Sequence, residues 1–172
     1  MSGHTSDRPR PPVQFRAAVP ADAERIAQIW EPGWHAGHDG HVPESLSLLR
    51  TSASFRERAA RMIDSTRVAV VDDEIVGFTV CSGDEIEQVY LAEEARGSGI
   101  AGLMLADAVR VVRAAGHAEP WLAVASGNAR ARRFYERQGW RDAGPFAYDA
   151  QTEHGTVPVS CHRYVLPAVV TH

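Results

Sequence analysis

A glycine-rich turn is the part of this sequence whose residue types and spacing most directly suggest chemistry. It separates a strand-like run at 86–91 from a helix-like run at 103–115. A strand, a glycine turn and a helix point main-chain N–H groups at an anion, because the first turn of a helix carries unpaired donors and the positive end of its dipole. The turn therefore predicts a phosphate site, although α/β proteins also use such turns simply to change direction. Its residues are Arg96, Gly97, Ser98, Gly99, Ile100, Ala101 and Gly102.

A second segment, 30–43, combines aromatic and imidazole side chains with residues that interrupt helices. Gly37, Gly40 and Pro43 argue against a long regular element, so we expect a loop. The histidine spacing of three would suit a metal on one helical face, but these breakers disfavour that helix and we predict no metal. The side chains either form hydrogen bonds within the loop or line an acceptor pocket. They are Trp30, Trp34, His35, His38 and His41.

The elements that position these residues follow from hydrophobic periodicity and from turn residues. We predict a tail at 1–12, rich in Arg and Pro, and one domain at 13–167. A helix at 52–64 should have Arg56, Glu57 and Arg61 on its wet face. The other expected helices begin at 20, 103 and 128, and strands are expected at 13–17, 67–71, 75–81, 83–91, 121–124, 146–148 and 157–166.

The composition limits the classes of partner. The chain has 172 residues and a net charge of −4, so a general nucleic-acid or membrane-surface binder, which normally has a basic excess, is not expected. No apolar run approaches a membrane span and the N-terminus does not resemble a signal peptide, which predicts a cytoplasmic protein. Cys81 and Cys161 lack metal-type spacing and are expected to be reduced thiols.

Two motifs in register resemble those of the GNAT superfamily of acyl-CoA-dependent N-acetyltransferases. The first, Gln/Arg-x-x-Gly-x-Gly/Ala, is matched by Arg96, Gly99 and Ala101. The second is an Asn followed seven residues later by Tyr, then by Gly and an aromatic residue. Asn128, Tyr135, Gly139 and Trp140 match it. The similarity covers about 15–166 and indicates a small bacterial member.

The resemblance implies a single α/β (α+β) domain, whose mixed, mostly antiparallel sheet is flanked by helices and splayed between two central strands. The pantetheine arm of acetyl-CoA, the expected co-substrate, would lie in this gap. Main-chain groups of Val89, Tyr90 and Leu91 would hold the arm and the thioester, and the amides of 97–102 would hold the diphosphate. Asn128 would also bind the cofactor. Arg132 is expected near the adenosine phosphate, unless its helix face is merely solvated.

The reaction implied is acetyl transfer to a primary amine of a small molecule by direct attack, with Tyr135 as general acid. A related glutamate, found in protein alanine acetyltransferases, corresponds here to Ala123. Glu87 is the expected base or acceptor ligand, and Glu85 should point the same way by strand alternation. His35 and His38 are the other candidates for the base.

The acceptor is expected to be compact and cationic, because tryptophans, histidines and Asp39 would enclose it. Free amino acids, polyamines and aminoglycoside-like molecules remain open, as does the acyl chain length. Acetylation of a protein N-terminus is an alternative, and a non-catalytic acyl-CoA-binding module is another. A homodimer is also expected, because final strands of such folds often pair across subunits.

Overall fold

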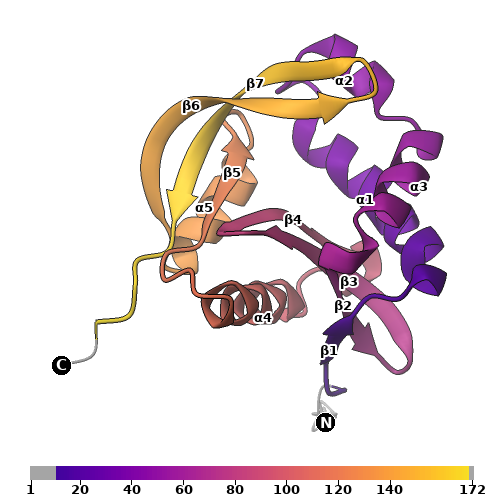
Figure 1. The fold of residues 1–172 in the computed structure, drawn as a ribbon, viewed down its shortest axis with the longest axis vertical. Coiled ribbons are helices and arrows are strands. Elements are labelled where there is room, and N and C mark those ends of the chain that lie inside the picture. The colour runs from indigo at the N-terminus through magenta and orange to yellow at the C-terminus, as the bar shows by residue number, and fades with distance from the viewer. Residues whose placement is uncertain (1–10, 171–172) are drawn as a thin grey trace, which may run out of the picture.

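The computed structural model describes residues 11–170, and Figure 1 shows how their elements are arranged. The predicted tail at 1–12 therefore lies outside the described residues, apart from its last two prolines. The helices are α1 (Ala23–His38), α2 (Glu44–Leu49), α3 (Ser52–Arg61), α4 (Ile100–Ala114) and α5 (Ala129–Arg137). The strands are β1 (Gln14–Ala17), β2 (Thr66–Val71), β3 (Glu74–Ser82), β4 (Glu85–Leu91), β5 (Trp121–Ala125), β6 (Arg141–Thr152) and β7 (Gly155–Val165). Short 3-10 turns are η1 (Pro20–Asp22), η2 (Ile63–Ser65) and η3 (Glu93–Ala95).

All the strands join one sheet in the order β1-β2-β3-β4-β5-β7-β6. Every neighbouring pair is antiparallel except β4 and β5, which run parallel. The crossover between these two strands contains α4, as a parallel connection requires. The mixed, mostly antiparallel sheet with flanking helices confirms the predicted fold class. The final hairpin is longer than predicted, and its two strands reach over the side of α2 (Figure 1).

Two main clusters of buried side chains hold helices against the sheet. One joins α1 and α3 to β3 through residues such as Trp30, Phe55 and Phe78. The other joins α4 to β4, β5 and β7 through residues such as Leu105 and Leu122. Because each cluster removes apolar surface from water, each fixes its helices relative to the strands beneath them.

The prediction of a loop over 30–43 is wrong for 30–38, because α1 continues as a helix to His38. It is confirmed only for the turn at 39–43. Pro32 stands inside this helix and cannot donate a main-chain hydrogen bond, which is a local cost. Trp30 and Trp34 are both buried in the first core cluster. Burial of two such large side chains stabilises the helix by more than its breakers cost, since tertiary packing supplies most helical stability. The sequence analysis also did not predict α2, which buries Leu46.

The glycines of α1 are required by close packing. A Cβ on Gly33 would lie 2.7 Å from Cδ1 of Tyr90 on β4. A Cβ on Gly37 would lie 3.0 Å from Nδ2 of Asn128, just before α5. The same residues that suggested a loop therefore allow α1 to approach β4 and the beginning of α5.

Among residues 11–170, no helix combines the length and the apolar character needed to cross a lipid bilayer.

We expect Gly33→Ala to lower the free energy of unfolding by about 1 kcal/mol, because overpacking against Tyr90 costs more than the gain in helix propensity. Propensity alone predicts the opposite sign, a gain of about 1 kcal/mol. Urea denaturation measures the difference. Gln28→Ala, at an exposed position of the same helix, is the control and should change stability by less than about 0.5 kcal/mol. A Gly33→Ala protein more stable than the wild type would contradict the packing.

Candidate active site

The splay between β4 and β5 is the main feature of the candidate site. Glu85 and Trp121 are the only Cα partners across this pair in the described chain. The N-terminal ends are joined there, since Trp121 donates from its main-chain nitrogen to Asp84 O at 3.1 Å and from Nε1 to Asp84 Oδ1 at 2.9 Å. Beyond this point, the facing main-chain groups of β4 and β5 have no strand partner. Buried main-chain groups need hydrogen-bond partners, so the gap suits a ligand that offers them.

The glycine turn leads into α4 with the geometry that an anion site needs. Gly97 and Gly99 have positive φ values of 75° and 81°, a conformation that glycine adopts without a Cβ penalty. Gly99 is the N-cap of α4. The Ser98 hydroxyl donates to Ala95 O and accepts from the Ile100 main-chain nitrogen. A Cβ on Gly97 would meet nothing within 4 Å. The open, positively polarised helix start therefore fits a diphosphate.

A cavity of about 400 Å³ lies where the two strands part. Residues of α1, α3, β4, β5, α5 and the β6–β7 hairpin line it. The structure brings several sequence-predicted residues to this one space. They are Trp34, His38, Glu85, Glu87, Val89, Tyr90, Asn128 and Tyr135.

Other predicted residues lie elsewhere. Trp30 is fully buried, and neither Trp30 nor His35 is part of the cavity lining. Leu91 and Arg96 line a second, smaller cavity of about 240 Å³ beside α1. The turn at 97–102 lines neither cavity. A direct contact of Trp30 or His35 with an acceptor does not follow from this arrangement.

Tyr135 extends from α5 into the cavity. Its ring packs against Phe134 and Trp140, with centroids 5.2 and 6.2 Å away. Burial raises the pKa of its phenol above the ordinary value of about 10, and its hydroxyl has no hydrogen-bond partner within residues 11–170. Tyr135 is therefore protonated at neutral pH, with a hydroxyl available to a ligand.

Glu85 and Glu87 both face the cavity from β4. The register between β3 and β4 shifts, because Val80 pairs with Gln88 and Cys81 with Ile86, and this leaves Glu87 as the extra residue of a bulge. Glu85 accepts a hydrogen bond of 2.6 Å from the Tyr148 hydroxyl. Burial raises the pKa of both carboxyl groups. A carboxylate with a raised pKa is a better general base near neutrality, and Glu87 is the one without a hydrogen-bond partner among the described residues.

The three histidines of the predicted loop point to different partners. The two ring nitrogens of His35 contact Asp39 at 2.9 Å and Arg50 O at 2.8 Å. His38 stacks on Trp34 at 4.5 Å, and its Nδ1 is bonded to Trp34 O. A Cβ on Gly127 would lie 2.2 Å from Nδ1 of His41. Within the part of the chain that the structure describes, no three His, Cys, Asp or Glu side chains gather as metal ligands would.

The His38 imidazole is neutral at physiological pH. Burial, with the nearby charges of Arg50 and Arg58, lowers its pKa to about 4. Because a group with this pKa has little affinity for a proton, His38 is a weaker candidate base than Glu87.

The cavity lining also contains three arginines, Arg50, Arg58 and Arg61. Arg61 was expected only on the wet face of its helix, and Arg50 and Arg58 were not predicted as site residues. One signal was present for Arg58. It stands three residues after Phe55 and one before Ala59, so helical spacing places it on the apolar stripe of α3 rather than on the wet face. No local pattern identifies Arg50, which ends the short helix α2. Tyr148, the partner of Glu85, was also missed.

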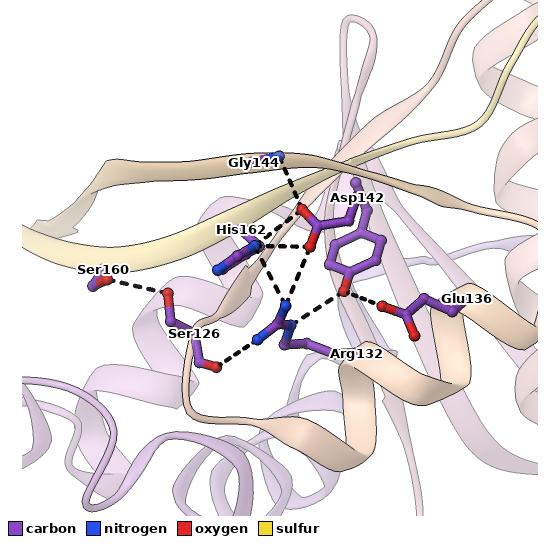
Figure 2. A network of polar contacts seen from close by, with 8 residues as sticks. Ser126, Arg132, Glu136, Asp142, Gly144, Ser160 and His162 are labelled. Carbon is purple, nitrogen blue, oxygen red and sulfur yellow. Dashed lines mark hydrogen bonds and ion pairs between the residues drawn. The ribbon is translucent and has the colours of Figure 1, made fainter.

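Asn128 and Arg132 have structural partners of their own. The Asn128 side chain is the N-cap of α5 and accepts from the Ala131 main-chain nitrogen at 3.2 Å. Figure 2 shows Arg132 among polar side chains of α5, β6 and β7. Its guanidinium donates to Tyr164 Oη, Ser126 O and Asp142 Oδ2, each at 3.2 Å. Their roles in cofactor binding remain predictions.

The Arg132 network also fixes the helix that carries Tyr135. The buried Tyr164 hydroxyl of β7 accepts from Arg132 and donates to Glu136 Oε1 at 2.9 Å. Arg132 precedes Tyr135 by three positions, and Glu136 follows it directly. The Nδ1 of His162 on β7 lies 3.0 Å from Oδ1 of Asp142 on β6 and forms a hydrogen bond with it (Figure 2). The network therefore ties α5 to the final hairpin.

Comparisons with known proteins agree with this arrangement. A model of the acetyltransferase (GNAT) family matches residues 23–140, which is more than half of the chain. A search of the curated proteins finds no match. Apo YjaB from Escherichia coli is similar in structure, with 19% identity, a TM-score of 0.68 and coverage of 92% of this chain and 99% of that one.

Two further similar structures contain the cofactor. PaiA N-acetyltransferase from Thermoplasma acidophilum, in complex with coenzyme A, has 17% identity and a TM-score of 0.67, covering 92% of this chain and 99% of that one. YncA from Salmonella typhimurium, solved with acetyl-CoA, has 16% identity and a TM-score of 0.62, covering 94% and 96%. At these identities the likeness shows the fold.

We expect Tyr164→Phe to lower the free energy of unfolding by about 1–2 kcal/mol, because it removes a buried hydroxyl that connects Arg132 and Glu136. Urea denaturation measures the change. Arg133→Gln, at an exposed position of α5, is the control and should stay within about 0.5 kcal/mol of the wild type. An unchanged midpoint for Tyr164→Phe would show that the network does not hold α5.

Proposed function

Because this chain belongs to the GNAT acetyltransferase family, we propose that it transfers an acetyl group from acetyl-CoA to a primary amine of a small molecule. One observation carries this proposal. A protonated tyrosine, Tyr135, and a carboxyl group with a raised pKa, Glu87, line a single cavity at the splay of the sheet. Proton removal from an attacking amine and proton delivery to a leaving group need such a pair.

The chain's own groups fit acetyl-CoA. The main chain of 97–102 would bind the diphosphate. Val89, Tyr90 and Leu91 pair with β3 on one side, and those of their main-chain groups that face the gap would hold the pantetheine arm. Asn128 would contribute its amide Nδ2, since its Oδ1 already caps α5. Arg132 would bind the adenosine phosphate only if its guanidinium shared, or gave up, its hydrogen bonds to Tyr164 and Asp142. When bound, acetyl-CoA supplies an acetyl group activated as a thioester.

The residues of the cavity would manage two protons. Glu87, directly or through a water, takes one proton from the attacking amine as the C–N bond forms. Tyr135 gives one proton to the leaving sulfur as the C–S bond breaks. A proton then passes from Glu87 to Tyr135 through solvent, so the sum of the steps is an amine and a thioester converted to an amide and a thiol.

The enclosure of the cavity favours a small acceptor over a protein N-terminus. The Arg50 guanidinium donates to Gln151 O at 2.8 Å, which joins α2 to the tip of the β6–β7 hairpin. The hairpin thus closes one side of the space. Free-thiol release from acetyl-CoA, measured across amino acids, polyamines, aminoglycosides and short peptides, tests the acceptor class. Tight cofactor binding without turnover on any acceptor would instead support a binding module.

We expect Tyr135→Phe to lower kcat by about 100-fold or more, since general acid catalysis contributes about 10²–10⁴. Coenzyme A binding, measured by calorimetry, should be unchanged because the substitution removes one hydroxyl. Arg137→Gln, at an exposed position in the last turn of α5, is the matched control and should retain full activity. A Tyr135→Phe enzyme with the wild-type kcat would remove Tyr135 from the mechanism.

The pH dependence of the rate tests Glu87. Burial raises its pKa, and the charge of Arg58 opposes the rise. A base acts only when deprotonated, so kcat/KM should fall as the pH is lowered through the raised pKa of Glu87. His38, with a pKa of about 4, and Arg58, with a pKa of about 10, do not titrate near neutrality. In Glu87→Gln the rate should drop by about 10-fold or more, and the fall that Glu87 causes at low pH should be lost, while the amine and Glu85, whose pKa is also raised, still titrate. An unchanged profile would exclude Glu87 as the base.

A further inference from the structure

Two arginines in the cavity have buried nitrogen atoms without partners. Arg50 is only 6% exposed, and its Nε has no hydrogen bond. Arg58 Nη1 is likewise buried and without a hydrogen bond. A buried donor that is left unpaired costs free energy, and a charged one costs more. Both side chains line the cavity, and the two unpaired nitrogens themselves are covered by other atoms. A ligand in the cavity would therefore meet the charge of the two guanidinium groups.

These guanidinium groups have no carboxylate in direct contact among the described residues. Among the described residues, neither Arg50 nor Arg58 forms an ion pair with a carboxylate. Arg58 instead lies over the Trp30 ring at 4.3 Å, and Arg50 lies 5.8 Å from the centre of the Trp34 ring. Aromatic faces compensate a cation only in part. Arg61 also lines the cavity, but it has a counter-charge, because Glu57 lies 3.6 Å from its guanidinium.

The positive charge persists at neutral pH and reaches across the cavity. Burial, together with the charges of Arg50 and Arg61, lowers the pKa of Arg58 to about 10, so it remains protonated. Burial and the charges of Arg50 and Arg58 lower the pKa of His38 on α1. Two buried like charges beside one cavity repel each other, and an anion bound between them would relieve this repulsion.

The carboxylates of the cavity lie on a different element from the arginines. Glu85 and Glu87 belong to β4, whereas Arg58 belongs to α3. Although Glu87 and Arg58 influence each other's charge, they are not paired within 4 Å. The cavity therefore has an acidic part beside the splay and a basic part beside α3.

We propose that the acceptor carries an oxyanion near its amine, in the simplest case the carboxylate of a free amino acid, and that Arg50 and Arg58 bind it. The inference rests on the proposed acetyl transfer. It narrows the expectation of a merely cationic acceptor, because a polyamine would place further positive charge against these arginines. The amine would lie beside Glu85 and Glu87, where Tyr135 also faces the cavity. The volume of about 400 Å³ suits a compact zwitterion rather than a long chain.

The first test compares matched acceptors with the wild-type enzyme. Each set contains an amino acid, its primary amide, the decarboxylated amine and the aminophosphonate analogue. The kcat/KM values are corrected for the fraction of neutral amine. The amino acid or the aminophosphonate should exceed the amide and the simple amine by about 100-fold, and the better of the two identifies the oxyanion. Equal or better use of the amide or the simple amine would overturn the proposal.

The second test assigns the preference to the arginine. Arg58→Gln removes the charge at similar length and should abolish the preference for the oxyanion, mainly through KM, so kcat/KM should fall much more for the oxyanion acceptors than for the amide. Arg56→Gln, on the exposed face of α3, is the matched control and should keep the preference. Loss of activity toward every acceptor in equal proportion would contradict a role in oxyanion binding. Since the wild-type comparison needs no variant, a poorly folded Arg58→Gln protein leaves the proposal testable.

A binding measurement separates this inference from the proposed reaction. Calorimetry records the binding of the same amino acids and aminophosphonates to the enzyme–coenzyme A complex. If no acceptor is acetylated but an oxyanion binds and Arg58→Gln weakens it by about 10-fold or more, the anion site stands and the proposed reaction fails. If transfer occurs and no oxyanion binds, the reaction stands and the anion site is refuted.

Discussion

The parting of β4 from β5 is the constraint on which the rest of the site depends. Asp84, Glu85 and Trp121 hold the two strands together at one end only. The bulge at Glu87 adds a residue to β4, and bulges increase the local twist of a strand. Main-chain groups that a sheet would normally pair are therefore left facing a gap. A ligand with amide and carbonyl groups along its length can form hydrogen bonds with these main-chain groups. One interrupted strand pairing can therefore create a binding site.

The gap persists because buried contacts on both faces of the sheet hold the strands around it in place. On one side, Phe78 packs with Trp30 and Phe55 beneath α1 and α3. On the other, α4 covers both strands, and the Arg132–Tyr164 network ties α5 to β7. Closing the gap would require β4 or β5 to move and would disturb these buried contacts, which close-packed interiors resist. Tyr135 on α5 and Glu87 on β4 thus face one cavity from elements that these contacts hold in place.

Several charged groups around the cavity are buried in ways that destabilise the folded protein. Arg50 and Arg58 have buried donors without partners, and Glu85 and Glu87 have pKa values raised by burial. A stable core would avoid each of these features, because unpaired buried charge is unfavourable. Their concentration around one space is typical of functional sites, where charge is arranged for a ligand rather than for the folded state. His38 is kept neutral in the same space.

The sequence by itself determined the order of most elements, the glycine turn and the motif of Asn128 and Tyr135, because turn residues and hydrophobic periodicity act over short distances. It also indicated Glu85 and Glu87 by strand alternation. It could not determine that α1 continues past Pro32 and Gly33, since that outcome depends on burial of Trp34 against distant residues and on the approach of Tyr90. Nor could it identify Arg50, whose place in the cavity is set by contacts with the final hairpin, about a hundred residues later. Only the tertiary structure decided these points, because long-range packing can outweigh local preference and no local pattern records it.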